Sequence, residues 1–221
     1  MPPATRVHDS IAERLGRLRS TALSDPAGAR DATWEWITEL GRGTRVDRAD
    51  CLFRLGELFA AGSVPRGLDG PTEGRLVAWA TRPLPDRALS LVTDLWLPWV
   101  GKRFDVASAT GDNLMAAPVR LVGRLVWPMY SFGSFEGKTS GFRFTTWEEK
   151  GKIDNGTDVL VIDYDSVPSN PRLAIRSVRD ELVEIVPGAN LGKMLWRTGN
   201  GDSARYSLLA YFALRTAVDE G

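Results

Sequence analysis

The spacing of apolar residues changes about a third of the way along the chain. Over residues 1–62 apolar side chains recur every three or four positions, as they do on one face of an amphipathic helix. The clearest stripes are Ile11, Leu15 and Leu18; Trp34, Ile37 and Leu40; and Leu52, Leu55, Leu58 and Phe59. Residues 63–72 are rich in proline and glycine, which do not sustain a helix. We therefore predict an N-terminal helical segment over residues 1–62.

From residue 73 onward the dominant period is two, which is typical of strands. Residues 73–80 and 101–109 read as two early strands, and two hairpins follow later in the chain. One hairpin is predicted around Asp154-Asn155-Gly156, because Asn-Gly tolerates the positive φ of a tight turn, and the other around residues 198–202.

Two intervening segments are predicted to include helix. Residues 115–130 read as a helix that begins near Pro118 and ends at Pro128, and we consider it a candidate lid. Residues 171–186 are ambiguous between helix and strand, and we expect a short helix that runs into a strand before Pro187-Gly188.

The late strands are apolar on both faces. In the last strand one face would carry Tyr206, Leu208, Ala210, Phe212 and Leu214, and the other Ser207, Leu209, Tyr211 and Ala213. A strand that is apolar on both sides must be covered twice. We therefore predict an α+β, mainly β fold in which residues 73–216 close into an antiparallel β-barrel and the helical segment packs on its outside. A barrel of eight to ten strands has room for about one small ligand.

The barrel segment resembles the calycin superfamily, which includes lipocalins and fatty-acid-binding proteins. The resemblance rests on the first strand EGRLVAW, the DNG and GNG hairpins and the aromatic last strand ARYSLLAYFALR, over residues 73–216. The chain departs from the Gly-x-Trp motif of many calycins, since its tryptophan in this strand comes later, at Trp79. It also has no histidine within residues 73–216, whereas the nitrobindin branch binds haem through one. The resemblance implies a barrel interior that holds a hydrophobic ligand.

Charge and composition narrow the range of functions. Lys plus Arg and Asp plus Glu number 28 each, so the net charge provides no electrostatic basis for binding nucleic acid. The longest apolar stretches, near residues 89–100 and 119–130, are too short and interrupted to span a bilayer. A single cysteine, Cys51, cannot form an internal disulfide, and we expect a cytoplasmic protein. The sequence does not specify the oligomeric state.

The scarcity of histidine and cysteine limits the chemistry. His8 and Cys51 are the only residues of their types, and both precede the predicted barrel of residues 73–216. A Ser-His-Asp site, a zinc centre or a His-ligated haem inside the barrel is therefore not expected, and we expect no metal and no cofactor. Proton transfer would have to use a carboxylate, a lysine or a tyrosine whose pKa is tuned by burial. We select Asp163, Tyr164 and Lys193 as candidate catalytic residues.

Two of these candidates, Lys193 and Asp163, have a structural alternative. Lys193 shares a strand face with Leu191 and Leu195, and a lysine on an apolar face can extend its ammonium to the rim of the barrel. The same is expected of Lys102. Asp163 or Asp180, placed beside Lys193 or Arg179, would form a structural ion pair.

The aromatic residues supply candidate ligand contacts. The candidates are Trp79, Phe104, Phe144, Trp147, Trp196, Tyr206 and Tyr211. Ordinary core packing is the alternative for each of them. We expect the protein to bind a small, largely hydrophobic molecule, such as a lipid, a polyketide or a terpenoid. A cofactor-independent cyclase, isomerase or lyase acting in the same cavity is the second hypothesis, and an interaction domain with a filled barrel is the third.

Overall fold

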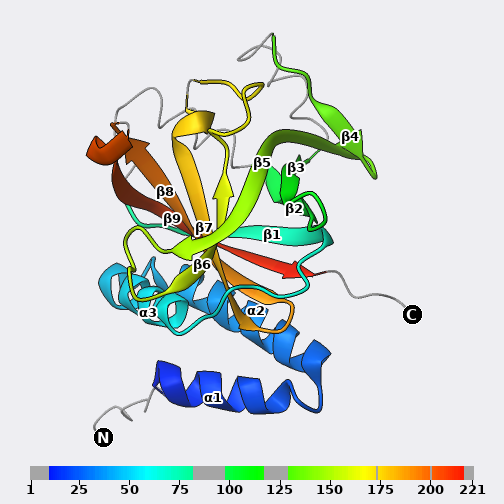
Figure 1. The fold of residues 1–221 in the computed structure, drawn as a ribbon. Helices are drawn as coiled ribbons and strands as arrows, with labels where there is room; N and C mark the ends of the chain where they lie inside the picture. The colour runs from blue at the N-terminus through cyan, green and yellow to red at the C-terminus, as the bar shows by residue number, and fades with distance from the viewer. Residues whose placement is uncertain (1–9, 82–97, 117–128, 173, 200, 217–221) are drawn as a thin grey trace, which may run out of the picture.

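The computed structural model describes residues 10–81, 98–116, 129–172, 174–199 and 201–216. Three helices precede nine strands and two short 3-10 helices in the described part of the chain (Figure 1). The elements are α1 (Ile11–Thr21), α2 (Pro26–Gly43), α3 (Arg48–Ala60), β1 (Gly70–Trp79), β2 (Trp99–Asp105), β3 (Thr110–Met115), β4 (Gly133–Phe135), β5 (Lys138–Lys150), β6 (Asp158–Asp163), η1 (Ile175–Ser177), β7 (Val178–Val186), β8 (Ala189–Thr198), η2 (Gly201–Ser203) and β9 (Arg205–Thr216).

Capping residues explain where the three N-terminal helices begin. Ser10 and Glu13 form a reciprocal capping box at α1, and the side chains of Asp25 and Asp47 cap α2 and α3 by accepting backbone N–H groups. The helices lie together against one side of the barrel, at the bottom of Figure 1. The prediction of N-terminal helices is confirmed over the described residues of this segment. No helix in the described ranges is long and apolar enough to cross a bilayer.

The strands form a closed antiparallel barrel. The sheet order is β3-β2-β1-β9-β8-β7-β6-β5, and β3 also pairs with β5, which closes eight strands into a ring. The short β4 adds to the free side of β5. The ring is joined least extensively between β1 and β2, where, among the described residues, only Gly70 and Pro71 of β1 pair, with Phe104 and Arg103 of β2. The predicted barrel with helices packed on its outside is confirmed.

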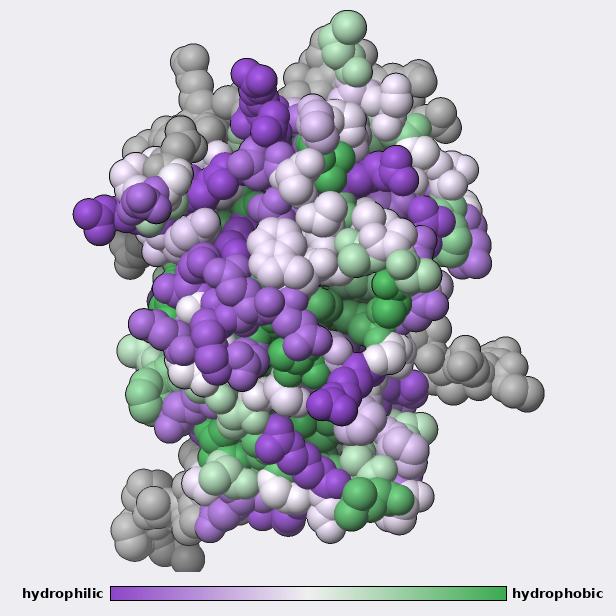
Figure 2. Space-filling model, in the orientation of Figure 1, coloured by the Kyte–Doolittle hydropathy of each residue, from purple (hydrophilic) through white to green (hydrophobic). Residues whose placement is uncertain are grey.

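Two cores account for strands that are apolar on both faces. The interior core includes Phe104, Phe144, Ile162 and Phe212. The second core lies between the helices and the outer face of the barrel, and it joins residues such as Trp34, Ile37, Phe59, Val161, Val183 and Leu191. Hydrophilic side chains cover much of the face seen in Figure 2, with smaller apolar areas between them.

A β-bulge changes the predicted faces of the last strand. Met194 of β8 pairs with Ala210, but Leu195 pairs with Leu208, so Leu209 is an extra residue in β9. Leu209 and Ala210 therefore both reach the interior core, while Leu208 packs on the helix side. The prediction that Leu208 shares the face of Phe212 is wrong, because the extra residue reverses the alternation.

Four local predictions have different outcomes. The hairpin between β5 and β6 forms, but neither Asn155 nor Gly156 has a positive φ, and the turn is closed by Gly151 N–H donating to Thr157 O at 3.0 Å. The strand predicted at 101–109 corresponds to β2 alone, which ends at Asp105; residues 106–109 form a turn that leads into β3 at Thr110. Met115 ends β3, and residues 117–128 of the predicted lid helix lie outside the described residues. The short helix expected before the strand of 171–186 is η1.

Candidate functional site

A fully buried lysine is the centre of the barrel interior. Lys102 of β2 has no exposed surface, and its Nζ donates to Asp180 Oδ2 at 2.8 Å, Asn113 Oδ1 at 2.9 Å and Tyr164 OH at 2.5 Å. Asn113 belongs to β3, Asp180 belongs to β7, and Tyr164 follows the last residue of β6. We call Lys102, Asn113, Tyr164 and Asp180 the Lys102 network.

A distortion of β2 brings two inward side chains close together. The pairing with β3 slips between Trp99 and Gly101, so that Trp99 and Lys102 both point into the barrel although they are three positions apart. Gly101 has φ 152°, and a Cβ there would lie 2.0 Å from the carbonyl oxygen of Thr72. The bulge therefore requires glycine at this position.

Hydrogen bonds connect the network to its surroundings. Tyr164 OH donates to Asp180 Oδ2 at 2.9 Å, and Asn113 Nδ2 donates to Tyr164 OH at 3.2 Å and to Phe142 O at 3.1 Å. Trp99 Nε1 donates to Asn113 Oδ1 at 3.1 Å. Asp180 Oδ1 is buried and accepts no hydrogen bond from any described residue. One buried carboxylate oxygen therefore remains available as an acceptor.

Aromatic rings surround the ammonium of Lys102. The centroids of Trp99, Phe144, Tyr164 and Phe212 lie between 5.2 and 5.5 Å from Nζ. At this distance the negative faces of the rings attract a cation, and the attraction is stronger where water is excluded. The rings thus stabilise the charge while keeping the surroundings apolar.

Burial shifts the ionisation of the whole network. Burial lowers the pKa of Lys102, and the adjacent Asp180 only partly opposes this effect. Burial likewise raises the pKa of Asp180 against the effect of Lys102. The pKa of Tyr164 is raised by burial and by the Asp180 charge. The charged and neutral forms of the Lys102–Asp180 pair are therefore closer in free energy than they are in water.

A small cavity adjoins the network at the end of the barrel away from the helices. Its volume is about 20 Å³, and Asn113 and Tyr164 line it together with apolar residues. These apolar residues are Trp99, Met115, Phe142, Ile175 and Val178. Such a space holds about one water molecule. The described side chains fill most of the remaining interior, so a larger molecule requires some of them to move.

The structure separates the three candidate catalytic residues. Tyr164 lies in the Lys102 network. Asp163 is only partly buried and accepts a hydrogen bond from Ser166 N–H. Lys193 lies on the helix side of β8, where Nζ is 2.6 Å from Asp154 Oδ2 and 4.4 Å from the centroid of Phe59. The structure therefore does not bring Asp163, Tyr164 and Lys193 together, since alternation places Lys193 on the helix side of the barrel wall.

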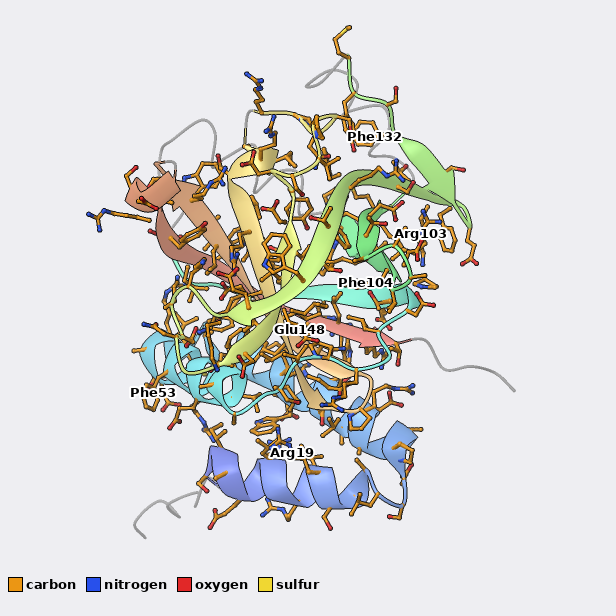
Figure 3. The ribbon with its side chains drawn as sticks, in the orientation of Figure 1. Arg19, Phe53, Arg103, Phe104, Phe132 and Glu148 are labelled. Atoms are coloured by element: carbon orange, nitrogen blue, oxygen red, sulfur yellow. The ribbon has the colours of Figure 1, made fainter. Side chains whose placement is uncertain are left out.

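The structure places four of the seven aromatic candidates at the barrel interior and three outside it. Phe104, which is labelled in Figure 3, and Phe144 belong to the interior core. Trp79 and Trp196 are partly buried and pack against this core. The other three are outside the barrel interior. Trp147 is 41% exposed, Tyr206 lies beside Arg179, and Tyr211 is in the core beneath the helices. These three cannot line an interior cavity.

Sequence reasoning missed three of the four network residues. Lys102 was expected at the rim, Asp180 was expected beside Lys193 or Arg179, and Asn113 was not considered. A signal for Lys102 exists, because Phe104 is two positions later and residues two apart share a strand face. Arg179 does form structural ion pairs, with Glu181 at 2.9 Å and Glu149 at 3.2 Å.

Comparison with known proteins adds no assignment. The chain matches no protein-family model, and neither a curated protein nor a solved structure matches it significantly. The inference of function therefore rests on the geometry of the site.

Proposed function

We propose that the barrel interior binds a small, largely hydrophobic molecule whose polar oxygen is held by the Lys102 network. The observation that carries this proposal is that Asn113 and Tyr164 belong both to the network and to the lining of the apolar cavity. A few polar groups converging on an apolar pocket are the usual arrangement of a small-molecule site. A lipid-, polyketide- or terpenoid-like compound with a carbonyl, hydroxyl or carboxyl group fits this chemistry.

The energetics of burial support the same proposal. Taking a lysine and an aspartate out of water is costly, and well-packed apolar residues often stabilise a fold as well or better. The Lys102–Asp180 pair is therefore not explained by stability alone. Asp180 Oδ1 has no donor among the described residues. A ligand hydroxyl or an ordered water would satisfy it.

The fold is also compatible with the calycin barrels that the sequence resembles. Lipocalins and fatty-acid-binding proteins enclose hydrophobic ligands in closed antiparallel barrels, and the resemblance implies a similar use of this interior. Entry of a ligand larger than water requires movement of cavity side chains. Met115 is well suited to this role, because its unbranched side chain adapts readily to new surroundings.

The proposal is tested by thermal shift and intrinsic tryptophan fluorescence with long-chain fatty acids, long-chain ketones and terpenoid alcohols. At least one class should raise the Tm saturably. Val178→Phe or Met115→Phe, which fill the cavity, should weaken binding by more than about tenfold. Lys102→Met should weaken binding of ligands with a polar end. Circular dichroism identifies variants that do not fold, and Ile153→Ser, an exposed change, is the control.

Two outcomes would overturn the proposal. One is that no ligand of the panel affects the wild-type protein. The other is that a folded cavity-filling variant binds as tightly as the wild type. Either result would favour an interaction domain with a filled barrel.

A cofactor-independent cyclase, isomerase or lyase is the second candidate function. The observation that favours it is the contact of a phenol, an ammonium and a carboxylate beside one cavity: Tyr164 could donate a proton to a substrate oxygen, while the Asp180 carboxylate accepts one and Lys102 stabilises the negative charge. Asp163 and Lys193 would have no part in it. Conversion of a bound panel compound, followed by mass spectrometry in D₂O, tests this function. Turnover that is unchanged in Tyr164→Phe would exclude the proposed role of Tyr164.

A further inference from the structure

Four arginines line one groove on the outside of the barrel. The groove has a volume of about 400 Å³ and lies between the end of α2, the start of α3 and β1. Arg42, Arg45, Arg48 and Arg75 contribute to its walls, and its described lining includes no Asp or Glu. We call it the arginine groove. Its volume falls within the range of about 300–1,000 Å³ that is common for ligand sites.

The local fold explains why these arginines converge. Arg42 is in the last turn of α2, Arg48 is the first residue of α3, and Arg45 lies in the turn between the helices. The turn is held by Val46 N–H donating to Gly43 O at 2.9 Å. Arg75 comes from β1, which approaches α2 so closely that a Cβ on Gly41 would lie 2.5 Å from the carbonyl oxygen of Val77.

Carboxylates compensate little of this positive charge. Arg42 pairs with Glu35 at 3.5 Å, and both side chains are about 60% exposed, so the pair is weak. Arg45, Arg48 and Arg75 form no salt bridge with any described residue. The balanced composition of the chain therefore conceals a local excess of positive charge.

Two of the guanidinium groups are held in position by neutral contacts. Arg48 Nη2 donates to Trp79 O at 2.7 Å. The Cζ of Arg75 lies 5.3 Å from the ring centroid of Trp34, which is itself buried. Guanidinium groups that are already oriented lose less side-chain entropy when they bind an anion. Their remaining N–H groups match the oxygens of a phosphate, which accepts paired hydrogen bonds from arginine.

A β-bulge in β1 also forms part of the groove. The pairing of β1 with β9 slips between Leu76 and Ala78, so Val77 is an extra residue outside the regular ladder. Val77 also lines the groove.

We infer that the arginine groove is a second binding site, distinct from the barrel interior, for a small phosphate-bearing molecule.

The test is isothermal titration calorimetry of the full chain with pyrophosphate at constant ionic strength. The inference predicts saturable binding that persists in chloride and weakens about tenfold or more in Arg45→Gln and in Arg75→Gln, as expected when a charge-assisted hydrogen bond is lost. Arg205→Gln is the matched control, because Arg205 is an exposed arginine outside the groove lining. It should bind pyrophosphate as the wild type does. Circular dichroism verifies that each variant folds.

A second experiment distinguishes binding of a soluble ligand from binding of a lipid headgroup. Co-sedimentation with phosphatidic acid vesicles, compared with phosphatidylcholine vesicles, reports headgroup binding. Pyrophosphate binding that depends on Arg45 and Arg75, without sedimentation, supports the inference. The inference is overturned if pyrophosphate does not bind, if only vesicles are bound, or if Arg205→Gln weakens binding as much as the groove variants.

Discussion

Lys102 and Asp180 reach each other across the full width of the barrel. Their strands, β2 and β7, are four positions apart in the closed ring of eight, on opposite walls. The Nζ of Lys102 nevertheless lies 2.8 Å from Asp180 Oδ2, and neither side chain has any exposure. The pair therefore ties opposite walls together where water does not screen it.

The first prediction concerns the stability of this pair. Lys102→Met or Asp180→Leu alone should reduce the free energy of unfolding by about 3–5 kcal/mol, because each leaves a buried charge unpaired. The double variant should lose less than the sum of the two single losses. Urea unfolding at pH 7 measures all three.

The control for this cycle is an exposed ion pair of similar length. Lys150 Nζ lies 2.8 Å from Asp158 Oδ1, with both side chains more than half exposed. Lys150→Met should cost less than about 1 kcal/mol. Additive losses in the Lys102/Asp180 cycle would show that the two side chains act independently, contrary to the structure.

The second prediction concerns a glycine that makes room for an aromatic ring. Gly192 of β8 pairs with Phe212, and a Cβ on Gly192 would lie 2.1 Å from the ring. Gly192→Ala should therefore destabilise the protein by about 1–3 kcal/mol, as overpacking does. It should also alter the near-UV circular dichroism, because Phe212 packs edge-to-face on Trp99 with centroids 5.7 Å apart.

Gly16→Ala is the matched control for that substitution. Gly16 is in α1, and a Cβ there meets no atom within 4 Å. The same change should stabilise the protein by about 0.5–1 kcal/mol through helix propensity. A Gly192→Ala protein as stable as the wild type would contradict the described packing of Phe212.

The third prediction concerns acid stability. Burial raises the pKa of Glu149, but hydrogen bonds from Lys152 and Trp147 and the charge of Arg179 outweigh it and lower the pKa from 4.5 to about 2. A carboxylate with a lowered pKa stabilises the fold above its unfolded pKa, and this contribution is lost as pH falls through the folded value. The stability advantage of the wild type over Glu149→Gln should therefore decrease between pH 4.5 and about 2.

Urea unfolding of both proteins at several pH values measures this difference. Glu148→Gln is the control, because Glu148 is the adjacent glutamate and is exposed. A difference between wild type and Glu149→Gln that stays constant over this range would contradict the ion pairs of Glu149.

Features that depend on residues close together in the sequence could be predicted from the sequence. The apolar stripes and the Ser and Asp caps specify the three helices, because helical hydrogen bonds and caps are local. The strands with two apolar faces required a closed and covered sheet, because each face must be removed from water. Both hairpins were located, although the turn at Asn155 and Gly156 has a different conformation from the one expected.

The candidate site depended on contacts that the sequence does not display. Extra residues at the start of β2 and at Leu209 of β9 reverse the alternation of faces, so the period of two no longer identifies which side chains point inward. Closure of the barrel then brings together Lys102 and Asp180, which are 78 positions apart.

The sequence by itself determined the N-terminal helices, most of the strands and the need for a closed, covered sheet, because propensity, capping and the alternation of apolar positions act within a few residues. The tertiary structure decided which charged side chains are buried together. That choice depends on strand register and on the fit of side chains across the interior, and both arise only when distant strands pack against one another.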